Sequence, residues 1–443
     1  MVGKTIFASL SNNQKSPICI FRISGPKVKN IIKNLCNYKI KPHKVNLAKI
    51  KKKDGSLLDQ AIVLYFKKPK SLTGEDLVEF HLHGSPSIIK EFQEILLTYK
   101  GVYVAEPGEF SKQAFDNNKM DLIQIEGLDD LYNSFTEKQR IQAQNAFLGG
   151  VSSELNSWRD SIINLNALIE SNIDFSDEDL PKNILTNFYD LLMNLKKDIV
   201  QQLKNSEKAK IIKEGLKVSV VGPPNSGKSS LINVITKKNV SIVDSNEGTT
   251  RDIVGTTLEI NGNLVNFYDT AGLKVTDNKV ESEGIKRAIE LAKISEIQIS
   301  MVDVSVDEWK KELNNVPKLG ILNINVANKI DLVKNENLDD ENTLFISTKT
   351  ETGISNLLKK INICVENITN TFIPPTLLRH RHIIAANNIK DCLERIERID
   401  INKNPELIAE DLRKSLFEIR RVTGLVDIEN ILDSIFSNFC IGK

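Results

Sequence analysis

A glycine-rich run in the middle of the chain has the residue types and spacing of a phosphate-binding loop. The run 222–229 reads Gly-Pro-Pro-Asn-Ser-Gly-Lys-Ser, and it lies between the largely apolar runs 218–221 and 231–235. This strand–loop–helix context lets backbone N–H groups surround a β-phosphate at a helix N-terminus. We expect Lys228 to reach the β- and γ-phosphates and Ser229 to ligate Mg²⁺. The run therefore predicts a nucleoside triphosphate site.

Three later segments have the spacing of the other contacts that a bound nucleotide needs. The run 269–272, Asp-Thr-Ala-Gly, ends a predicted strand, where a carboxylate near Mg²⁺ and a γ-phosphate sensor would lie. The run 328–331, Asn-Lys-Ile-Asp, ends another, and its aspartate can accept from N1–H and N2–H of guanine, a donor pair that adenine lacks. The run 347–349 fits the loop that backs the base, although Thr348 replaces the usual alanine. The pattern predicts GTP rather than ATP.

The segment between these motifs bears on the mechanism of hydrolysis. The run 248–252, Gly-Thr-Thr-Arg-Asp, lies where a GTPase supplies a threonine to Mg²⁺, and we assign that role to Thr250. Read alone, this run also fits a plain turn followed by a strand. Leu273 occupies the position where Ras-like enzymes place the glutamine that orients the attacking water. Because leucine cannot orient water, hydrolysis needs another water-positioning group and another positive charge.

Two candidates can supply what Leu273 lacks. Asn225 and the polar run 244–247 could hold a monovalent cation against the phosphates, in place of an arginine finger. Glu281 could orient the water. The residues alone leave two simpler interpretations open, a solvated loop and a carboxylate at a helix start. The predicted nucleotide contacts are Asn225, Ser226, Gly227, Lys228, Ser229, Ser230, Asp244, Ser245, Asn246, Glu247, Gly248, Thr249, Thr250, Asp269, Thr270, Ala271, Gly272, Asn328, Lys329, Asp331, Ser347, Thr348 and Lys349.

Hydrophobic periodicity divides the chain into four segments. Residues 1–118 contain short β-rich runs, residues 119–213 and 367–443 have a helical period, and residues 214–366 alternate strands with helices. We predict an N-terminal α+β domain, a discontinuous helical bundle whose halves pack together, and an inserted Ras-like P-loop domain. One predicted helical stripe comprises Leu148, Val151, Leu155, Trp158, Ile162, Leu165 and Ile169. The strands predicted for the inserted domain are 217–221, 256–260, 264–268, 297–304, 321–327 and 343–347, with a hairpin at 261–263.

Composition excludes several classes of protein. The 443 residues include 59 Lys+Arg and 58 Asp+Glu, so a globally basic nucleic-acid coat is excluded. Hydrophobic residues make up 40%, which is enough for packed cores. The five cysteines lie far apart without a Cys-x-x-Cys pair, which argues against a disulfide scaffold or a cysteine-rich zinc site. The sequence has neither a signal-peptide pattern nor an apolar run of membrane-spanning length, so we predict a soluble cytoplasmic protein.

Several short segments, spread along nearly the whole chain, form a specific pattern when they are taken together. The N-terminal part contains the runs 73–84, TGEDLVEFHLHG, and 107–110, PGEF. The middle contains GPPNSGKSS, GTTRD, DTAGL and NKID, and the run 440–443, CIGK, follows the second helical segment. In these motifs and in their order the chain resembles the MnmE (TrmE) family of tRNA modification GTPases.

The resemblance implies a biochemical role. Members are homodimers whose N-terminal domain dimerises and binds folate, and looks like the tetrahydrofolate domain of the glycine-cleavage T-protein. With the FAD-carrying partner MnmG, in a heterotetramer of two copies each, they add an aminomethyl or carboxymethylaminomethyl group to C5 of the wobble uridine of tRNA. The one-carbon unit comes from a tetrahydrofolate derivative, 5-formyl- or 5,10-methylenetetrahydrofolate. The G domains dimerise in GTP and K⁺, and this activates hydrolysis.

The resemblance also implies roles for individual residues. Folate-site positions are Arg22, Glu79, Lys119 and Lys443; K⁺ positions are Asn225, Asp244, Asn246 and Thr249; Mg²⁺ ligands are Ser229 and Thr250; the catalytic glutamate is Glu281; and Cys440 has a possible role in modification. The run 11–17 departs from the glycine-rich stretch of the family. An alternative hypothesis is a GTP-controlled switch in ribosome or RNA assembly without a direct role in modification. The folate-like segment and the C-terminal tetrapeptide favour the first hypothesis, since a switch needs neither.

Overall fold

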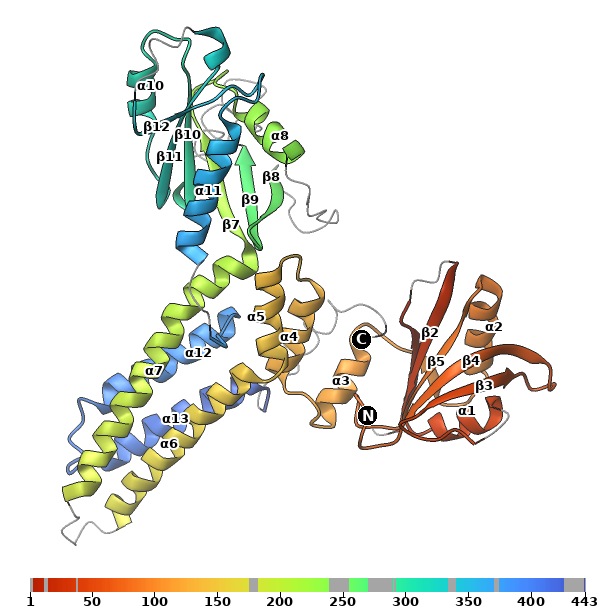
Figure 1. The fold of residues 1–443 in the computed structure, drawn as a ribbon. Coiled ribbons are helices and arrows are strands. Elements are labelled where there is room, and N and C mark those ends of the chain that lie inside the picture. Colours follow the sequence, from red (N-terminus) through yellow and green to blue (C-terminus); the bar gives the residue numbers. More distant parts are fainter. Residues whose placement is uncertain are drawn as a thin grey trace, which may run out of the picture. The chain divides into compact units, whose positions relative to one another are not determined.

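The chain forms two compact units, each with its own sheet (Figure 1). The first comprises residues 1–129, 146–193 and 388–443, and the second comprises residues 130–145 and 194–387. The structure is a computed structural model. It describes residues 3–11, 15–36, 39–174, 182–238, 255–269, 290, 292–333, 340–369, 374–425 and 442.

The sheet of the first unit is six-stranded, with the order β3-β4-β5-β2-β1-β6. Its neighbouring strands are antiparallel except β1 and β6, which are parallel. Helices α1 (Val28–Leu35) and α2 (Pro86–Leu97) cover one face, where Phe21, Phe80 and Phe92 are buried. Because side chains alternate along a strand, Arg22 and Glu79 belong to the opposite face. The strands are β1 (Thr5–Ser9), β2 (Ser16–Ser24), β3 (Val45–Lys51), β4 (Leu57–Phe66), β5 (Leu77–Gly84) and β6 (Val102–Val104).

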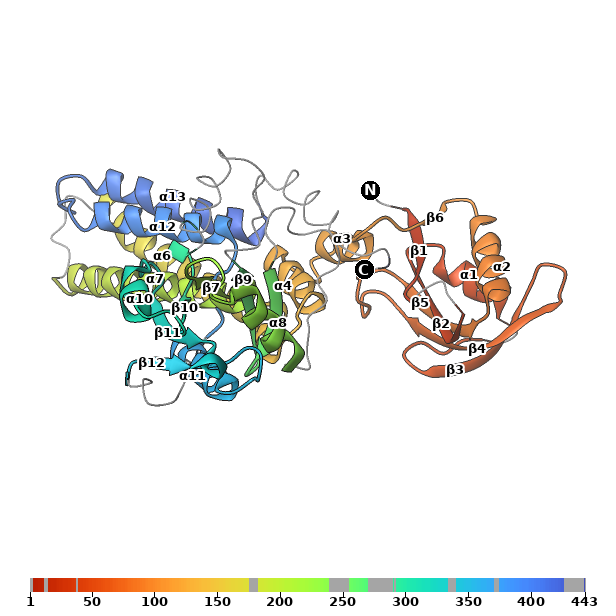
Figure 2. The same cartoon turned by 90° about the horizontal axis from the view of Figure 1, so that it is seen from above.

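Helices dominate the segments on either side of the second sheet in the sequence. Within the first unit, α6 packs against α13, and Arg413 Nη2 donates to Glu170 Oε1 at 2.8 Å (Figures 1 and 2). The expected packing of the two helical segments is therefore confirmed for this pair. The helices are α3 (Glu109–Asp116), α4 (Leu122–Tyr132), α5 (Glu137–Phe147), α6 (Gly150–Asp174), α7 (Lys182–Glu214), α12 (His380–Ile396) and α13 (Pro405–Thr423).

The predicted apolar stripe on α6 is confirmed except at its first position. The residues from Val151 to Ile169 on this stripe are buried. Leu148 is 76% exposed, so its assignment to the stripe was wrong. The reason is Gly149, which has a φ of +86° and separates the helical path of α5 from that of α6.

The second sheet is also six-stranded, with the order β12-β11-β10-β7-β9-β8. Its neighbouring strands are parallel except β8 and β9, which form an antiparallel hairpin. Helices α8 (Lys228–Lys238), α10 (Trp309–Asn315) and α11 (Ile354–Thr369) flank it (Figure 1). The strands are β7 (Leu216–Val221), β8 (Gly255–Ile260), β9 (Asn263–Asp269), β10 (Ile297–Asp303), β11 (Leu322–Asn328) and β12 (Thr343–Phe345).

The strands predicted for this sheet are confirmed to within two residues at each end. The predicted hairpin is also confirmed, since Asn261 and Gly262 have φ angles of +52° and +71°, which a tight primed turn requires. The last strand ends earlier than the predicted 343–347. Ser347 turns away from the ladder because its N–H donates to Thr352 O at 2.9 Å.

One carboxylate ties together the two ends of the segment that forms the second sheet. Asp130, in the last turn of α4, accepts hydrogen bonds from Lys213 Nζ at 2.8 and 2.9 Å and from Arg379 Nη2 at 2.9 Å. Lys213 lies three residues before β7, and Arg379 directly precedes α12. Gln139 on α5 reinforces the junction, because its Nε2 donates to Lys213 O at 2.9 Å.

The helices and cysteines give two further observations. Among the described residues, none of the helices combines the length and the hydropathy that crossing a bilayer requires. Cys19, Cys36, Cys364 and Cys392 are free and buried. Cys440 lies outside the described residues.

Candidate nucleotide-binding site

The glycine-rich loop between β7 and α8 is closely packed against two neighbouring strands. A Cβ atom on Gly222 would lie 1.9 Å from Met301 O on β10. Gly227 has a φ of +101°, and a Cβ there would lie 2.2 Å from Asn328 Nδ2 on β11. Both positions therefore require glycine. Asn225 also has a left-handed backbone, with a φ of +62°.

Lys228 begins α8, and its side chain reaches back to the start of this loop. Its Nζ donates to Gly222 O at 2.9 Å and to Pro223 O at 2.8 Å, and the residue is only 6% exposed. Burial lowers the pKa of Lys228, and the charge of Asp269 partly opposes that effect. The buried ammonium is thus held by two loop carbonyls. The negative charge of a bound phosphate would offset the free-energy cost of its burial.

The position of the loop in the sheet is that of a ligand site. The strand order reverses beside β7, because the chain runs from β7 to β8 and β9 on one side of the sheet and from β10 to β11 and β12 on the other. In open α/β sheets, ligands bind at such a switch point, beyond the carboxyl ends of the strands. Asp269 ends β9 in register with Val220, which brings it beside the start of the loop.

Asn328 connects the glycine-rich loop to the segment that follows β12. It is fully buried, and its Nδ2 donates to Ser226 O at 2.9 Å. Its Oδ1 accepts from the Thr348 N–H at 3.0 Å, and Thr348 Oγ1 accepts from Nδ2 at 3.3 Å. The threonine that replaces the usual alanine therefore adds an acceptor for this amide. Asn328 therefore links two predicted nucleotide contacts, Ser226 and Thr348, by hydrogen bonds.

An ion pair fixes the residue next to Asn328. Lys329, with a φ of +69°, forms an ion pair with Asp303 at the end of β10. Burial raises the pKa of Asp303, but hydrogen bonds from Lys329 and Ser305 outweigh it and hold the pKa below its ordinary value. Asp303 belongs to none of the motifs recognised in the sequence, although an acidic residue at the end of a buried strand on this edge is a pattern that could identify it.

Asp331 is exposed, and a hydrogen bond from Ser347 orients its carboxylate. Ser347 Oγ donates to Asp331 Oδ1 at 2.6 Å and accepts from the N–H groups of Lys349 and Thr350 at 3.3 and 3.1 Å. Ser347 is fully buried, whereas Asp331 is exposed. The carboxylate is therefore oriented and still accessible to the purine base of a nucleotide.

The carboxyl-end edge of the sheet brings together the predicted contacts that the structure describes. Ser229 and Ser230 begin α8 and are exposed. The assembled residues are Asn225, Ser226, Gly227, Lys228, Ser229, Ser230, Asp269, Asn328, Lys329, Asp331, Ser347, Thr348 and Lys349. The following predicted residues lie outside the described ones: Asp244, Ser245, Asn246, Glu247, Gly248, Thr249, Thr250, Thr270, Ala271, Gly272 and Glu281.

A second group of predicted residues lies in the first unit. Arg22 on β2 pairs in register with Glu79 on β5, and its Nε and Nη2 lie 2.9 and 2.8 Å from Glu79 Oε1. Phe110 of α3 lies against the guanidinium, 5.7 Å from ring centroid to Arg22 Cζ. Lys119 is exposed in the turn after α3. Lys443 lies outside the described residues.

Comparisons with known proteins cover the whole chain. The family model of the TrmE N-terminus, described as a GTP-binding protein, matches residues 5–119, and the MnmE helical domain model matches residues 122–440. The tRNA modification GTPase MnmE of Rickettsia bellii (strain OSU 85-389) is 38% identical over 453 aligned residues, covering 99% of this chain and 100% of that protein. The chain belongs to the MnmE family of tRNA modification GTPases.

Other relatives and a solved structure give the range of similarity. The MnmE protein of Rickettsia prowazekii (strain Madrid E) is 38% identical over 99% of this chain and 100% of its own length. That of Orientia tsutsugamushi (strain Boryong) is 36% identical, and both chains are covered completely. The G domain of the FeoB iron transporter of T. maritima is 23% identical, covering 34% of this chain and 98% of its own, with a TM-score of 0.26.

Proposed function

We propose that this protein hydrolyses GTP as part of a tRNA-modifying complex. The observation that carries the proposal is the closely packed glycine-rich loop, which Asn328 holds through Ser226, in a chain whose full length matches MnmE proteins. Lys228 contacts the β- and γ-phosphates, Asp331 accepts from the guanine N–H groups, and Asn328 holds the two regions together. Asp269 lies beside the loop, with Ser229 exposed at the start of α8.

In the same proposal, two groups of residues hold the ions that hydrolysis needs. Ser229 and Thr250 hold Mg²⁺, and the exposed Ser229 hydroxyl on the first turn of α8 fits that role. Asn225, Asp244, Asn246 and Thr249 hold K⁺; Asn225 is exposed in the loop and has a left-handed backbone. A bound K⁺ supplies the positive charge that an arginine finger supplies elsewhere. Glu281 orients the attacking water in place of Leu273.

GTP turnover is expected to depend on the identity of the monovalent cation. In K⁺ the rate should exceed that in Na⁺ by about tenfold or more, since a missing positive charge at the phosphates removes a large part of the acceleration. Phosphate release at matched ionic strength measures the effect, and Asn225→Ala should reduce the advantage of K⁺. Equal rates in the two salts would contradict the proposed cation site.

The first unit supplies folate binding and dimerisation in this proposal. Arg22 and Glu79 form a largely buried pair beside an aromatic ring, which suits the polar edge and flat body of a pterin. Lys119 and Lys443 complete the site for a 5-formyl- or 5,10-methylenetetrahydrofolate. Gly442 lies beside Ser9 and Leu10 at the end of β1, so this residue of the C-terminal tetrapeptide reaches the sheet. The exposed apolar side chains of Val45, Leu47 and Ile62 suit contact with a second copy.

The complex acts in the cytoplasm with MnmG, which carries the FAD. Together they add the aminomethyl or carboxymethylaminomethyl group to C5 of the wobble uridine, with a role for Cys440 in that step. The proposed domains are 1–118 for folate binding and dimerisation, 119–213 and 367–443 for the helical domain, and 214–366 for the GTPase domain. The matches of separate family models to residues 5–119 and 122–440 support the first of these boundaries.

The proposal is tested by the tRNA of a strain that lacks the gene. Wobble uridines should lose the C5 group, and the wild-type gene should restore it, as measured by mass spectrometry of digested tRNA. Complementation with Lys228→Met should fail. Unchanged wobble uridines in the deletion strain would instead support the alternative, a GTP-controlled assembly switch.

A further inference from the structure

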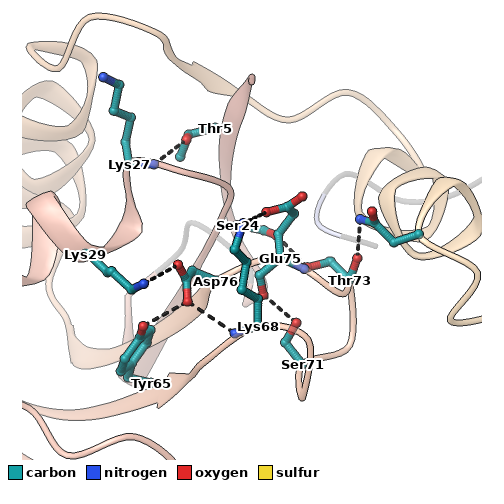
Figure 3. A network of polar contacts seen from close by, with 11 residues as sticks. Thr5, Ser24, Lys27, Lys29, Tyr65, Lys68, Ser71, Thr73, Glu75 and Asp76 are labelled. Atoms are coloured by element: carbon teal, nitrogen blue, oxygen red, sulfur yellow. Dashed lines mark hydrogen bonds and ion pairs between the residues drawn. The ribbon is translucent and has the colours of Figure 1, made fainter. Parts of the chain in front are cut away.

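A buried threonine links three segments of the first unit (Figure 3). Thr73 is fully buried, and its Oγ1 lies 2.7 Å from Ser24 Oγ, so the two hydroxyls form a hydrogen bond. Its carbonyl oxygen accepts from Asn117 Nδ2 at 2.8 Å. Ser24 ends β2 two residues after Arg22, and Asn117 follows α3 two residues before Lys119. Thr73 thus connects β2, which carries the predicted folate contact Arg22, to the turn that carries the predicted folate contact Lys119.

The loop that carries Thr73 is itself firmly anchored. Asp76 accepts from Tyr65 O–H at 2.8 Å and from the Lys68 N–H at 3.2 Å, and it forms an ion pair with Lys29 at 3.3 Å (Figure 3). Burial raises the pKa of Asp76, but the hydrogen bonds from Tyr65 and Lys68 and the Lys29 charge outweigh it and keep the pKa low. The charged aspartate therefore holds the loop to β4 and α1, so that Thr73 is a fixed point.

The turn after α3 packs closely against the loop that carries Thr73. Gly74 has a φ of +79°, and a Cβ there would lie 2.8 Å from Asn117 Cβ. Asn118 has a φ of +53°, and the Lys119 N–H donates to Ala114 O at 2.7 Å. The backbone of Lys119 is thus fixed by α3 on one side and, through Asn117, by Thr73 on the other.

We propose that Asn117 is a positioning residue for the folate ligand. The inference rests on the proposed folate-binding function. Phe110 at the start of α3 touches Arg22, whereas Lys119 follows the end of that helix, and eight helical residues span about 12 Å. A ligand that reaches both ends is therefore elongated, with a pterin at Arg22 and Glu79 and glutamate carboxylates toward Lys119. The Asn117 amide sets where the Lys119 ammonium lies along that ligand.

The test measures binding of 5-formyltetrahydrofolate to the full-length protein by calorimetry. Asn117→Ala should raise Kd about tenfold or more, with GTP hydrolysis unchanged. Asn117→Asp, which keeps the shape and loses the donor, should behave in the same way. The matched control is Asn46→Ala, because the buried Asn46 amide likewise donates to main-chain carbonyls, those of Lys41, Lys44 and Val63, on the edge strand β3. This control should lower the Tm and keep the Kd.

The outcomes separate this inference from the function on which it rests. Wild-type affinity in both Asn117 variants, or an equal loss in Asn46→Ala, would overturn the positioning role. Arg22→Ala tests the folate site itself and should abolish binding. Failure of the wild-type protein to bind, or an unchanged Kd in Arg22→Ala, would overturn the folate function and the positioning role with it.

Discussion

Replacing Lys228 by methionine is expected to lower kcat/KM for GTP by about 10²–10³-fold, the cost of removing a preorganised donor to developing phosphate charge. Methionine keeps most of the volume of the buried stem, so the loop between Gly222 and Lys228 should retain its shape. The ammonium that now donates to two loop carbonyls is the group that a triphosphate would use. Phosphate release under subsaturating GTP measures the loss.

A control variant on the same helix tests whether the loss of activity comes from the charge at the loop or from the loss of any positive charge on α8. Lys237 is exposed on α8, nine residues beyond Lys228, and Lys237→Met removes one positive charge without touching the loop. This variant should hydrolyse GTP at the wild-type rate. A Lys228→Met protein with near-normal kcat/KM would show that the loop is not the phosphate site.

Replacing Asp331 by asparagine is expected to weaken GTP binding by about 10²-fold and to favour xanthosine triphosphate. The carboxylate accepts from two guanine N–H groups, and each hydrogen bond to a charged group contributes about 1.5–3 kcal/mol. An asparagine amide places N–H donors opposite one of these donors. Xanthine has an oxygen at C2, so that the same amide can donate to it. Kd values for the two nucleotides, measured by competition, give the change in selectivity.

The serine behind Asp331 provides the control. Ser347→Ala removes the 2.6 Å hydrogen bond that orients the carboxylate but leaves its charge and acceptors in place. It should weaken GTP binding less than Asp331→Asn does, and it should give xanthosine triphosphate no advantage. An unchanged preference for GTP in Asp331→Asn would refute the assignment of the guanine contact.

Local patterns in the sequence were sufficient to predict most of the second sheet. Its strands read as short apolar runs, and Asn261-Gly262 identifies the hairpin because both residues tolerate positive φ. The error at Leu148 arose because an apolar stripe carries no information about where the helix begins, whereas Gly149 does. The strand order could not be read in this way, since it depends on pairings between segments far apart in the chain.

The candidate site was predictable where one segment carries the chemistry and less so where several segments share it. Gly222 to Ser229 forms a complete motif, so Lys228 was identified from its neighbours alone. Asp303 was missed because its significance comes from Lys329, 26 residues away, which it pairs with. The link from Ser24 through Thr73 to Asn117 was missed for the same reason, because no spacing in the sequence relates these residues.

The carboxylate of Asp130 also bears on how a chain of this kind can be assembled from modules. Lys213 and Arg379 are 166 positions apart, yet both contact the same side chain. A segment whose two ends meet at one point can be spliced into a helical host, or exchanged for another, with only a local join. Here the residues between the two anchors carry the second sheet, and Asp130, with the reinforcing contact of Gln139, holds both ends of that segment at one point.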